Sequence, residues 1–246
     1  MSYIHKESFS IRTSEINHLR KVHPHALIQI MQEASMQHTI GMKVSVWDLA
    51  SMQGAWVLIK MEVNFFNYPA LNDTIKVHTY PSGKEGYFTF RDYLVYDEED
   101  ILIATASSQW TMMHTGSRKM MKIPDSFGEL IYQYDKPLSK PEFRLKPGEN
   151  LINSREIKTT YFHLDWNGHV NNVVMIRMIL ENLDDTIYYQ KNLKSLKIQF
   201  KSEAVIAQVL CVHFESLDSD NIIRHTVTDK LTGKELVLAE TLWENY

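Results

Sequence analysis

Apolar side chains follow two periods along the chain, one typical of helices and the other of strands. From Leu27 they recur at Ile30, Met31 and Ala34, which is the spacing of one helical face and predicts an amphipathic helix that ends at Gly41. Further segments show strand-like patterns and are bounded by glycine, proline or acidic turns. These predicted strands are residues 9–15, 56–66, 74–80, 87–96 and 101–113, with a polar and aromatic connector at 47–53.

The second half of the chain repeats this order of elements. One strand, one helix and four further strands are predicted at residues 155–162, 170–183, 193–201, 205–214, 222–230 and 235–243. The matched pieces are 18–19 with 163–164, 75–78 with 210–213, and 101–106 plus Trp110 with 235–239 plus Trp243. Internal similarity of this kind predicts two copies of one supersecondary unit.

The order of elements predicts an α+β fold of two tandem units, in each of which a long helix packs on an antiparallel sheet. The predicted boundaries are residues 1–114 for the first unit, 115–150 for a linker and 151–246 for the second unit. The linker holds four prolines and alternating charges, so we expect it to run over the outside.

Composition places the chain among soluble globular proteins. Apolar residues make up 44% and charged residues 23% of its 246 residues, and a net charge of −4 does not point to nucleic acid. The N-terminus has no apolar signal segment, no apolar run approaches the roughly 20 residues of a membrane helix, and the single cysteine fits a reducing cytoplasm. Neither a nucleotide-type glycine pattern nor a metal-spaced Cys/His set occurs, so no cofactor or metal is expected.

Candidate chemistry gathers in the stretch Tyr161–Glu181. A polar turn there carries Asp165, Asn167, His169 and Asn171, and an apolar helix follows it. The first N–H groups of a helix lack internal partners and favour negative charge, so such a junction can hold an oxyanion or a carboxylate. The same residue types are also ordinary turn and capping residues. The local pattern leaves both interpretations open.

The two copies differ in this turn. The first copy reads Arg20–His25, whereas only the second copy combines an acid, an amide and an imidazole, at Asp165, Asn167 and His169. Two purely structural turns should differ less in chemistry. The difference favours one active copy and one supporting copy.

The sequence Asp165–Asn172 resembles the D-x-N-x-H-V-N-N motif of the acyl-acyl carrier protein (ACP) thioesterases, the plant FatA/FatB type and its bacterial relatives. The resemblance covers nearly the whole chain. Residues 56–83 look like the family's W…Y-P-x-x-x-D stretch, and Trp110–Met113 with Lys122–Asp125 look like its W-x-x-M and K-I-P-D segments. The resemblance implies a double hot-dog fold. It also implies an enzyme that hydrolyses fatty acyl-ACP to free fatty acid and ACP in fatty acid biosynthesis, with the acyl chain held in the first unit.

The same resemblance implies the catalytic residues. Asp165, Asn167 and His169 match the family's active-site loop, and Glu203 matches a carboxylate on the following strand. Ala204 stands where many relatives have cysteine, which removes a Cys-His-Asn mechanism at that position and favours water as the nucleophile. Glu203 would be the general base, His169 would relay the proton or orient the water, and Asn167 would hold the water or the carbonyl oxygen. Asp165 would fix the loop, with a role as the base left open.

Other functions compete with this interpretation. An acyl-CoA thioesterase of the same fold would recognise a nucleotide, whereas the basic cluster Arg118, Lys119 and Lys122 suits an acidic carrier protein unless it is an ordinary solvated face. A non-catalytic sensor of acyl thioesters would keep the acyl slot and lose the polar loop. A hot-dog dehydratase would carry a motif that this chain lacks. A monomer and a homodimer both stay open.

Overall fold

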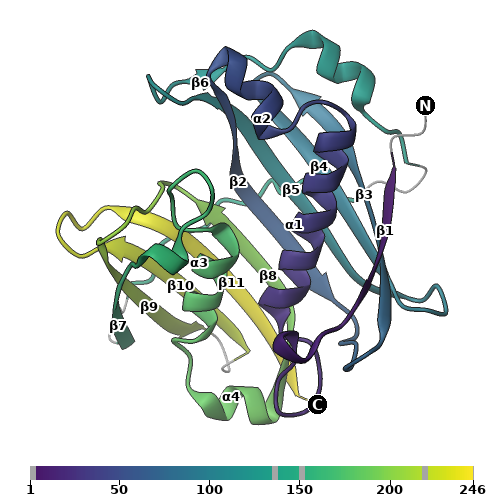
Figure 1. Cartoon of the computed structure of the whole chain (residues 1–246). Coiled ribbons are helices and arrows are strands. Elements are labelled where there is room, and N and C mark those ends of the chain that lie inside the picture. Colours follow the sequence, from purple (N-terminus) through teal and green to yellow (C-terminus); the bar gives the residue numbers. More distant parts are fainter. Residues whose placement is uncertain (1–3, 135–137, 150–152, 218–220, 246) are drawn as a thin grey trace. The chain divides into compact units, whose positions relative to one another are not determined.

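A helix against an antiparallel sheet is the plan of both units into which the chain divides, Met1–Pro141 and Glu142–Tyr246 (Figure 1). The computed structural model describes residues 4–134, 138–149, 153–217 and 221–245. Among these residues, no helix combines the length and the apolar character needed to cross a bilayer. The predicted class, α+β with one long helix and one antiparallel sheet in each unit, is confirmed.

The N-terminal unit is built around α1 (Pro24–Gly41), which lies across one face of its sheet (Figure 1). Pro24 suits the first turn of α1 because an N–H there would have no helical partner. Leu27, Met31 and Ala34 are completely buried, so the apolar stripe read from the sequence is the face that meets the sheet. The strands in sheet order are β1 (His5–Ser10), β3 (Thr74–Glu85), β4 (Phe88–Tyr96), β5 (Leu102–His114) and β2 (Gly54–Phe65), with the short β6 (Met120–Met121) paired to β5.

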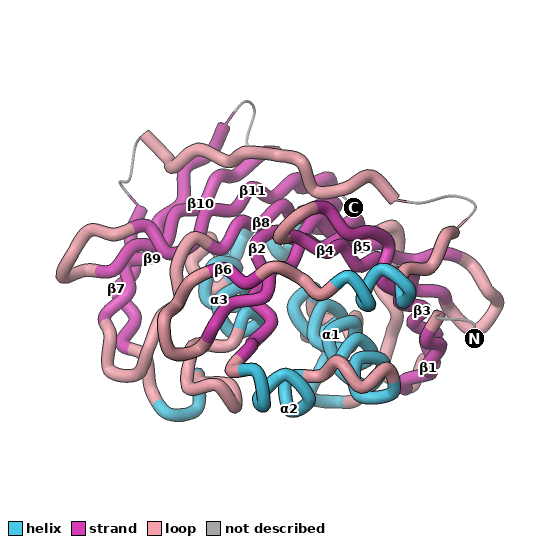
Figure 2. Tube along the Cα trace, turned by 90° about the horizontal axis from the view of Figure 1, so that it is seen from above, coloured by secondary structure: helices cyan, strands magenta, loops and turns pink. Residues whose placement is uncertain are grey.

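The C-terminal unit repeats the plan with the shorter helix α3 (Asn172–Leu180), which lies against its own sheet (Figure 2). Met175, Ile176 and Ile179 of α3 are buried. A second helix, α4 (Asp185–Gln190), was not predicted. The strands in sheet order are β8 (Lys191–Phe200), β11 (Glu235–Asn245), β10 (Ile222–Asp229), β9 (Val209–Leu217) and β7 (Asn153–Lys158).

Matching hydrogen bonds confirm that the two units are copies of one plan. Trp110 Nε1 donates to Ser108 Oγ at 2.8 Å on β5, and Trp243 Nε1 donates to Thr241 Oγ1 at 2.9 Å on β11. In each case the acceptor lies two residues before the tryptophan on the last main strand of its unit. The correspondence between these two tryptophans, expected from the sequence, is therefore correct.

Strand ends near the two turns differ from the prediction. The predicted strands 9–15 and 155–162 are placed too far along the chain. β1 and β7 begin earlier, at His5 and Asn153, and end at Ser10 and Lys158, and short 3-10 turns, Thr13–Glu15 and Tyr161–His163, follow them. Over three residues, an apolar pattern does not separate a strand from a 3-10 turn. β3 is longer than predicted because its ladder with β4 resumes after a bulge at Pro81.

The predicted connector at 47–53 is instead helical, with α2 (Val46–Leu49) followed by the 3-10 turn η2 (Ala50–Met52). Ser45 begins α2 with a capping box, in which its backbone N–H donates to Asp48 Oδ2 at 2.8 Å. Leu49 packs with Met112 and Ile123 in a buried cluster. Capping and burial stabilise a helix that is too short to show periodicity in the sequence.

Candidate active site

The polar turn before α3 is held together by Asp165. Asp165 Oδ1 accepts the backbone N–H of Asn167 at 2.8 Å and that of His169 at 3.3 Å. The Asp165 N–H donates to the His169 carbonyl oxygen at 2.8 Å, and a bridge between Leu164 and Val170 closes the turn. These bonds match the loop-fixing role expected for Asp165, and they engage one of its two carboxylate oxygens.

Gly168 allows the turn to reverse direction. Its φ of +76° lies in the left-handed region, which residues with a Cβ adopt at a cost. A Cβ built on Gly168 would meet nothing within 4 Å. The glycine is therefore needed for its backbone angle.

His169 and Glu203 come together across two segments of the C-terminal unit. Their Nε2 and Oε2 atoms lie 3.4 Å apart, and the two side chains are 21% and 28% exposed. The backbone enforces this proximity, because the Val170 N–H donates to the Ala204 carbonyl oxygen at 2.8 Å and His169 forms a bridge with Val205. An imidazole and a carboxylate at this separation, both reachable by solvent, can share a proton and orient a water molecule.

Backbone donors in this turn are largely used within the protein. Asn167 and His169 donate to Asp165, Gly168 donates to the Asp165 carbonyl, and Val170 donates to Ala204. At the start of α3, the Asn171 side chain accepts the Val173 N–H at 2.7 Å and so caps the helix. These N–H groups are therefore not available to bind an oxyanion.

The side-chain amide of Asn167 is the better donor for a developing negative charge. Asn167 is half-buried, and among the described residues its side chain forms no hydrogen bond. Preorganised amide donors of this kind stabilise tetrahedral intermediates of acyl transfer. The arrangement thus favours Asn167 over the backbone N–H groups of the turn for that role.

Thr159 is a site residue that the sequence did not reveal. It is almost completely buried, and its Oγ1 donates to the Val205 carbonyl oxygen at 2.6 Å and accepts the Gln208 N–H at 3.0 Å. It thereby joins the segment before the active-site turn to the segment that carries Glu203. That segment remains a loop as far as residue 208, so the strand predicted from 205 begins later, at β9. No sequence signal singles out a lone threonine.

Cysteine chemistry has no support at this site. Ala204 is buried beside Glu203, and the only cysteine, Cys211, lies on β9 and is partly exposed. Burial raises the pKa of the Cys211 thiol, which disfavours the reactive thiolate. Among the described residues, no group of three or more His, Cys, Asp or Glu side chains is placed to hold a metal ion.

The N-terminal unit folds a matching turn before α1, although its alignment with the sequence differs from the expected one. Asn17 takes the place of Asp165: its Oδ1 accepts the N–H groups of Leu19 at 3.0 Å and Lys21 at 3.1 Å. The Asn17 N–H donates to the Lys21 carbonyl at 2.9 Å, and a bridge joins residues 16 and 22. The predicted match of His18-Leu19 with His163-Leu164 is therefore wrong, because the two turns correspond in their hydrogen bonds and not in their residue types.

With this alignment, the first copy lacks the reactive groups. Lys21 stands where the second copy has His169, and Leu19 stands where it has Asn167. The Val22 N–H donates to the Pro69 carbonyl at 2.8 Å, just as Val170 donates to Ala204, so Tyr68 occupies the position of Glu203. At these positions the first copy has no imidazole facing a carboxylate, whereas the second has His169 beside Glu203.

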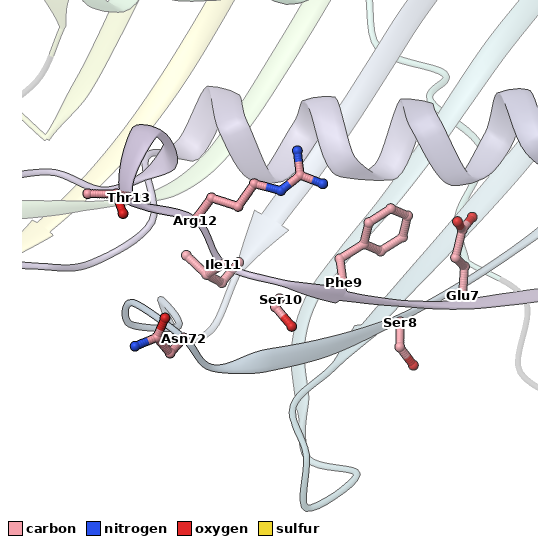
Figure 3. A pocket seen from close by; sticks show the side chains of 8 residues that line it. All are labelled: Glu7, Ser8, Phe9, Ser10, Ile11, Arg12, Thr13 and Asn72. Atoms are coloured by element: carbon pink, nitrogen blue, oxygen red, sulfur yellow. The ribbon is translucent and has the colours of Figure 1, made fainter.

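A hollow beside the first-copy turn shows the same lack of reactive pairs (Figure 3). Its side chains come from β1, from the start of the turn and from the loop before β3. The lining residues are Glu7, Ser8, Phe9, Ser10, Ile11, Arg12, Thr13 and Asn72. In Figure 3, Arg12 and Glu7 lie at opposite ends of the hollow with Phe9 between them, so the hollow offers no arrangement like that of His169 and Glu203.

Comparison with known families also divides the chain into an N-terminal and a C-terminal domain. Residues 2–131 match the family model for the acyl-ACP thioesterase N-terminal domain, and residues 149–245 match the model for the acyl-ACP thioesterase C-terminal domain. The chain belongs to the acyl-ACP thioesterase family.

Two curated relatives are plant proteins. The chain is 29% identical over 97% of its length to acyl-[acyl-carrier-protein] hydrolase FATB3, chloroplastic, of Cuphea viscosissima. It is 24% identical over 93% of its length to oleoyl-acyl carrier protein thioesterase, chloroplastic, of Coriandrum sativum. The chain spans 62% and 66% of the length of these two relatives.

Two solved structures share the fold. One is an acyl-ACP thioesterase from Bacteroides thetaiotaomicron, with a TM-score of 0.89 at 20% identity and 98% coverage of both chains. The other is the 12:0-ACP thioesterase from Umbellularia californica, with a TM-score of 0.89 at 22% identity, covering 100% of this chain and 99% of that one. These matches confirm the double hot-dog fold predicted from the family resemblance.

Proposed function

We propose that the protein hydrolyses the thioester of a fatty acyl group carried on ACP, releasing free fatty acid and ACP. The observation that carries this proposal is the approach of His169 Nε2 to Glu203 Oε2, 3.4 Å apart, beside a turn fixed by Asp165. Membership of the acyl-ACP thioesterase family supports the substrate class. The names of the curated relatives, which are acyl-ACP hydrolases and thioesterases, support the reaction.

The proposed mechanism uses water as the nucleophile. Glu203 takes a proton from the water as its oxygen attacks the thioester carbonyl carbon, and the Asn167 amide donates to the carbonyl oxygen as negative charge develops there. The tetrahedral intermediate then breaks the carbon–sulfur bond and expels the thiolate of the carrier. His169, which shares the proton with Glu203, returns it to the sulfur, so that acid and thiol leave together.

Asp165 acts in this scheme as a positioning residue. Its Oδ1 is occupied by the N–H groups of Asn167 and His169, so it sets the direction of the two side chains that meet substrate. Glu203 is the better base because it faces the imidazole directly. Thr159 supports the same geometry by joining the two segments.

The cellular setting is part of the proposal. Release of fatty acids from ACP belongs to fatty acid biosynthesis. We place the enzyme in the cytoplasm, a location supported by the use of a single cysteine in the sequence and tested by cell fractionation. Sedimentation of the purified protein distinguishes a monomer from a homodimer.

The test is thiol release from a panel of acyl-ACPs and the matching acyl-CoAs, with His169→Ala as the inactive control. The proposal requires faster release from ACP than from CoA, lost by about 10² or more in the variant. Release from CoA alone would make the protein an acyl-CoA thioesterase. Binding to both carriers without release would make it a sensor of acyl thioesters.

A further inference from the structure

Exposed apolar side chains occur on α2, η2 and β6, which lie at one end of the N-terminal unit (Figure 1) and adjoin a common buried cluster. Trp47, Met52 and Met120 are 61%, 44% and 50% exposed. Single apolar side chains are common on protein surfaces, but several on adjoining segments mark an interaction site. Tryptophan and methionine are also the residue types enriched where proteins contact one another.

These segments form a fixed platform. The N–H and Oγ1 of Thr115 both donate to the Gln53 carbonyl, at 2.8 and 3.2 Å, which ties the turn after β5 to the end of η2. Leu49 of α2 is buried with Met112 of β5, the residue that pairs with Met121 of β6. A platform held in this way can bind a partner without first becoming ordered, which lowers the cost of association.

The platform is basic. Residues 43–53 and 114–125 together contain four cations and two carboxylates, although the whole chain has a net charge of −4. Lys43, Lys119 and Lys122 among these cations are exposed to solvent. A local concentration of positive charge on an otherwise negative protein steers negatively charged partners to that place.

Both carboxylates of these segments are already engaged. Asp48 accepts hydrogen bonds from Ser45, which hold the pKa of its carboxyl below the usual range. Asp125 pairs with Lys84 at 2.8 Å, and its other carboxylate oxygen lies 3.8 Å from Lys122 Nζ. Because two carboxylates stand against four cations in these segments, the surface keeps a net positive charge although Asp125 also lies beside Lys122.

We infer that this surface binds the carrier protein of the substrate, with an acidic helix of the carrier lying on it. We call it the α2–β6 surface and define it as Lys43, Trp47, Met52, Lys119, Met120 and Lys122. The inference rests on the proposed function, because an acyl-CoA substrate has no protein part to engage such a surface. Apolar side chains beside lysines fit the apolar and acidic positions of an amphipathic helix.

A protein partner fits this surface better than a membrane. An anionic bilayer would gain about 1 kcal/mol for each lysine near it, but it would also face the carboxylates of Asp48 and Asp125. A helix with patterned charges can place its acids over the lysines and leave the two carboxylates in solvent. The arrangement of charges therefore favours a carrier protein.

The test compares one acyl group on ACP and on CoA. In the variant Lys119→Glu/Lys122→Glu, we expect the KM for acyl-ACP to rise by about tenfold while kcat, and kcat/KM for acyl-CoA, stay within about twofold of wild type. The matched control is Lys146→Glu/Lys234→Glu, which makes the same change in net charge at exposed lysines outside the surface. It should leave both substrates unaffected.

A second variant, Trp47→Ala, tests the apolar part without changing charge. We expect it to raise the KM for acyl-ACP at high ionic strength, where the contribution of the lysines is screened. Because Trp47 is exposed, the variant should fold normally, which circular dichroism checks.

Several outcomes would overturn the inference. Unchanged acyl-ACP kinetics in the lysine variant, equal losses on both substrates, or an equal loss in the Lys146→Glu/Lys234→Glu control would each do so. Co-sedimentation of the wild type with phosphatidylglycerol vesicles, abolished in the lysine variant while acyl-ACP kinetics stay the same, would assign the surface to a membrane. If the wild type itself fails to release thiol from acyl-ACP, the proposed function fails first, and that result is distinct from all of these.

Discussion

The turn before α1 and the turn before α3 share one backbone and differ in chemistry. In both, a side-chain oxygen, from Asn17 or Asp165, accepts two N–H groups of its own turn, and the turn pairs with a distant loop. Only the second turn adds an imidazole that faces a carboxylate, with His169 beside Glu203. The fold therefore needs the hydrogen bonds of this turn but not its reactive groups.

This comparison separates structure from function within one molecule. A residue that is present in both turns, such as the Asx acceptor, is explained by folding. A residue present only in the second turn, such as His169, is explained by the proposed reaction. Equivalent substitutions in the two turns should thus cost similar stability and very different activity.

The largest expected difference in lost activity is between substitutions of Glu203 and of Tyr68, which occupy equivalent positions. Glu203→Gln removes the general base, and we expect kcat to fall by about 10² to 10⁴. Tyr68→Phe should change kcat by less than about twofold. Steady-state thiol release from acyl-ACP measures both, and a Glu203→Gln enzyme that keeps more than a third of its activity would remove Glu203 from the mechanism.

The two Asx residues should separate stability from activity. Asp165→Ala and Asn17→Ala each remove an acceptor of two backbone N–H groups, and we expect each to lower the free energy of unfolding by about 1–3 kcal/mol. Only Asp165→Ala should also lower kcat, by about 10², because the misplaced loop carries the reacting groups. Urea unfolding and thiol release provide the two measurements. A similar loss of activity in both variants would contradict the division of roles.

The buried His225 should make the C-terminal unit sensitive to acid. Burial lowers the pKa of His225 to about 3, so between about pH 6.5 and 3 the unfolded chain binds a proton that the folded chain does not. The free energy of unfolding therefore falls as pH falls through this range, by up to about 1.4 kcal/mol per pH unit from this group. His225→Gln should make the free energy of unfolding depend less on pH than it does in the wild type. The contributions of the other titrating groups cancel in this comparison. Parallel profiles would show that His225 takes up a proton as readily in the folded state as in the unfolded state.

The smallest effects concern the left-handed residue of each turn. Gly168 has a φ of +76° and its counterpart Arg20 has a φ of +61°. Gly168→Ala should lower the free energy of unfolding by about 1 kcal/mol, whereas Arg20→Gly should change it by less, since relief of backbone strain opposes the greater freedom of the unfolded chain. Thermal unfolding of the two variants tests this, and equal destabilisation would show that backbone strain is not what distinguishes them.

Much of the fold could be predicted from the sequence because it depends on periodicity. The apolar face of α1 and the strands β2, β4 and β5 repeat over enough residues to be recognised. The short helix α2 could not be predicted in this way, because its stability comes from the Ser45 cap and the burial of Leu49. Short elements depend on contacts that are distant in sequence.

The candidate site was predicted in part. The motif named Asp165, Asn167 and His169, the wider family resemblance named Glu203, and the structure brings these residues to adjoining segments of one unit. The sequence could not indicate Thr159, whose hydroxyl links the two segments, because a single hydrogen bond leaves no pattern. The sequence comparison also misaligned the first-copy turn. It matched residue types, whereas the two turns correspond in backbone hydrogen bonds that the residue types do not reveal.

The most direct test compares removal of the reactive pair with removal of its counterpart in the same protein. Thiol release from acyl-ACP is measured for His169→Ala/Glu203→Gln and for Lys21→Ala/Tyr68→Phe, with both proteins shown to be folded. The account predicts that the first variant loses activity by at least about 10³ and that the second stays within about twofold of wild type. Comparable activity in the two variants would contradict the assignment of catalysis to the turn before α3.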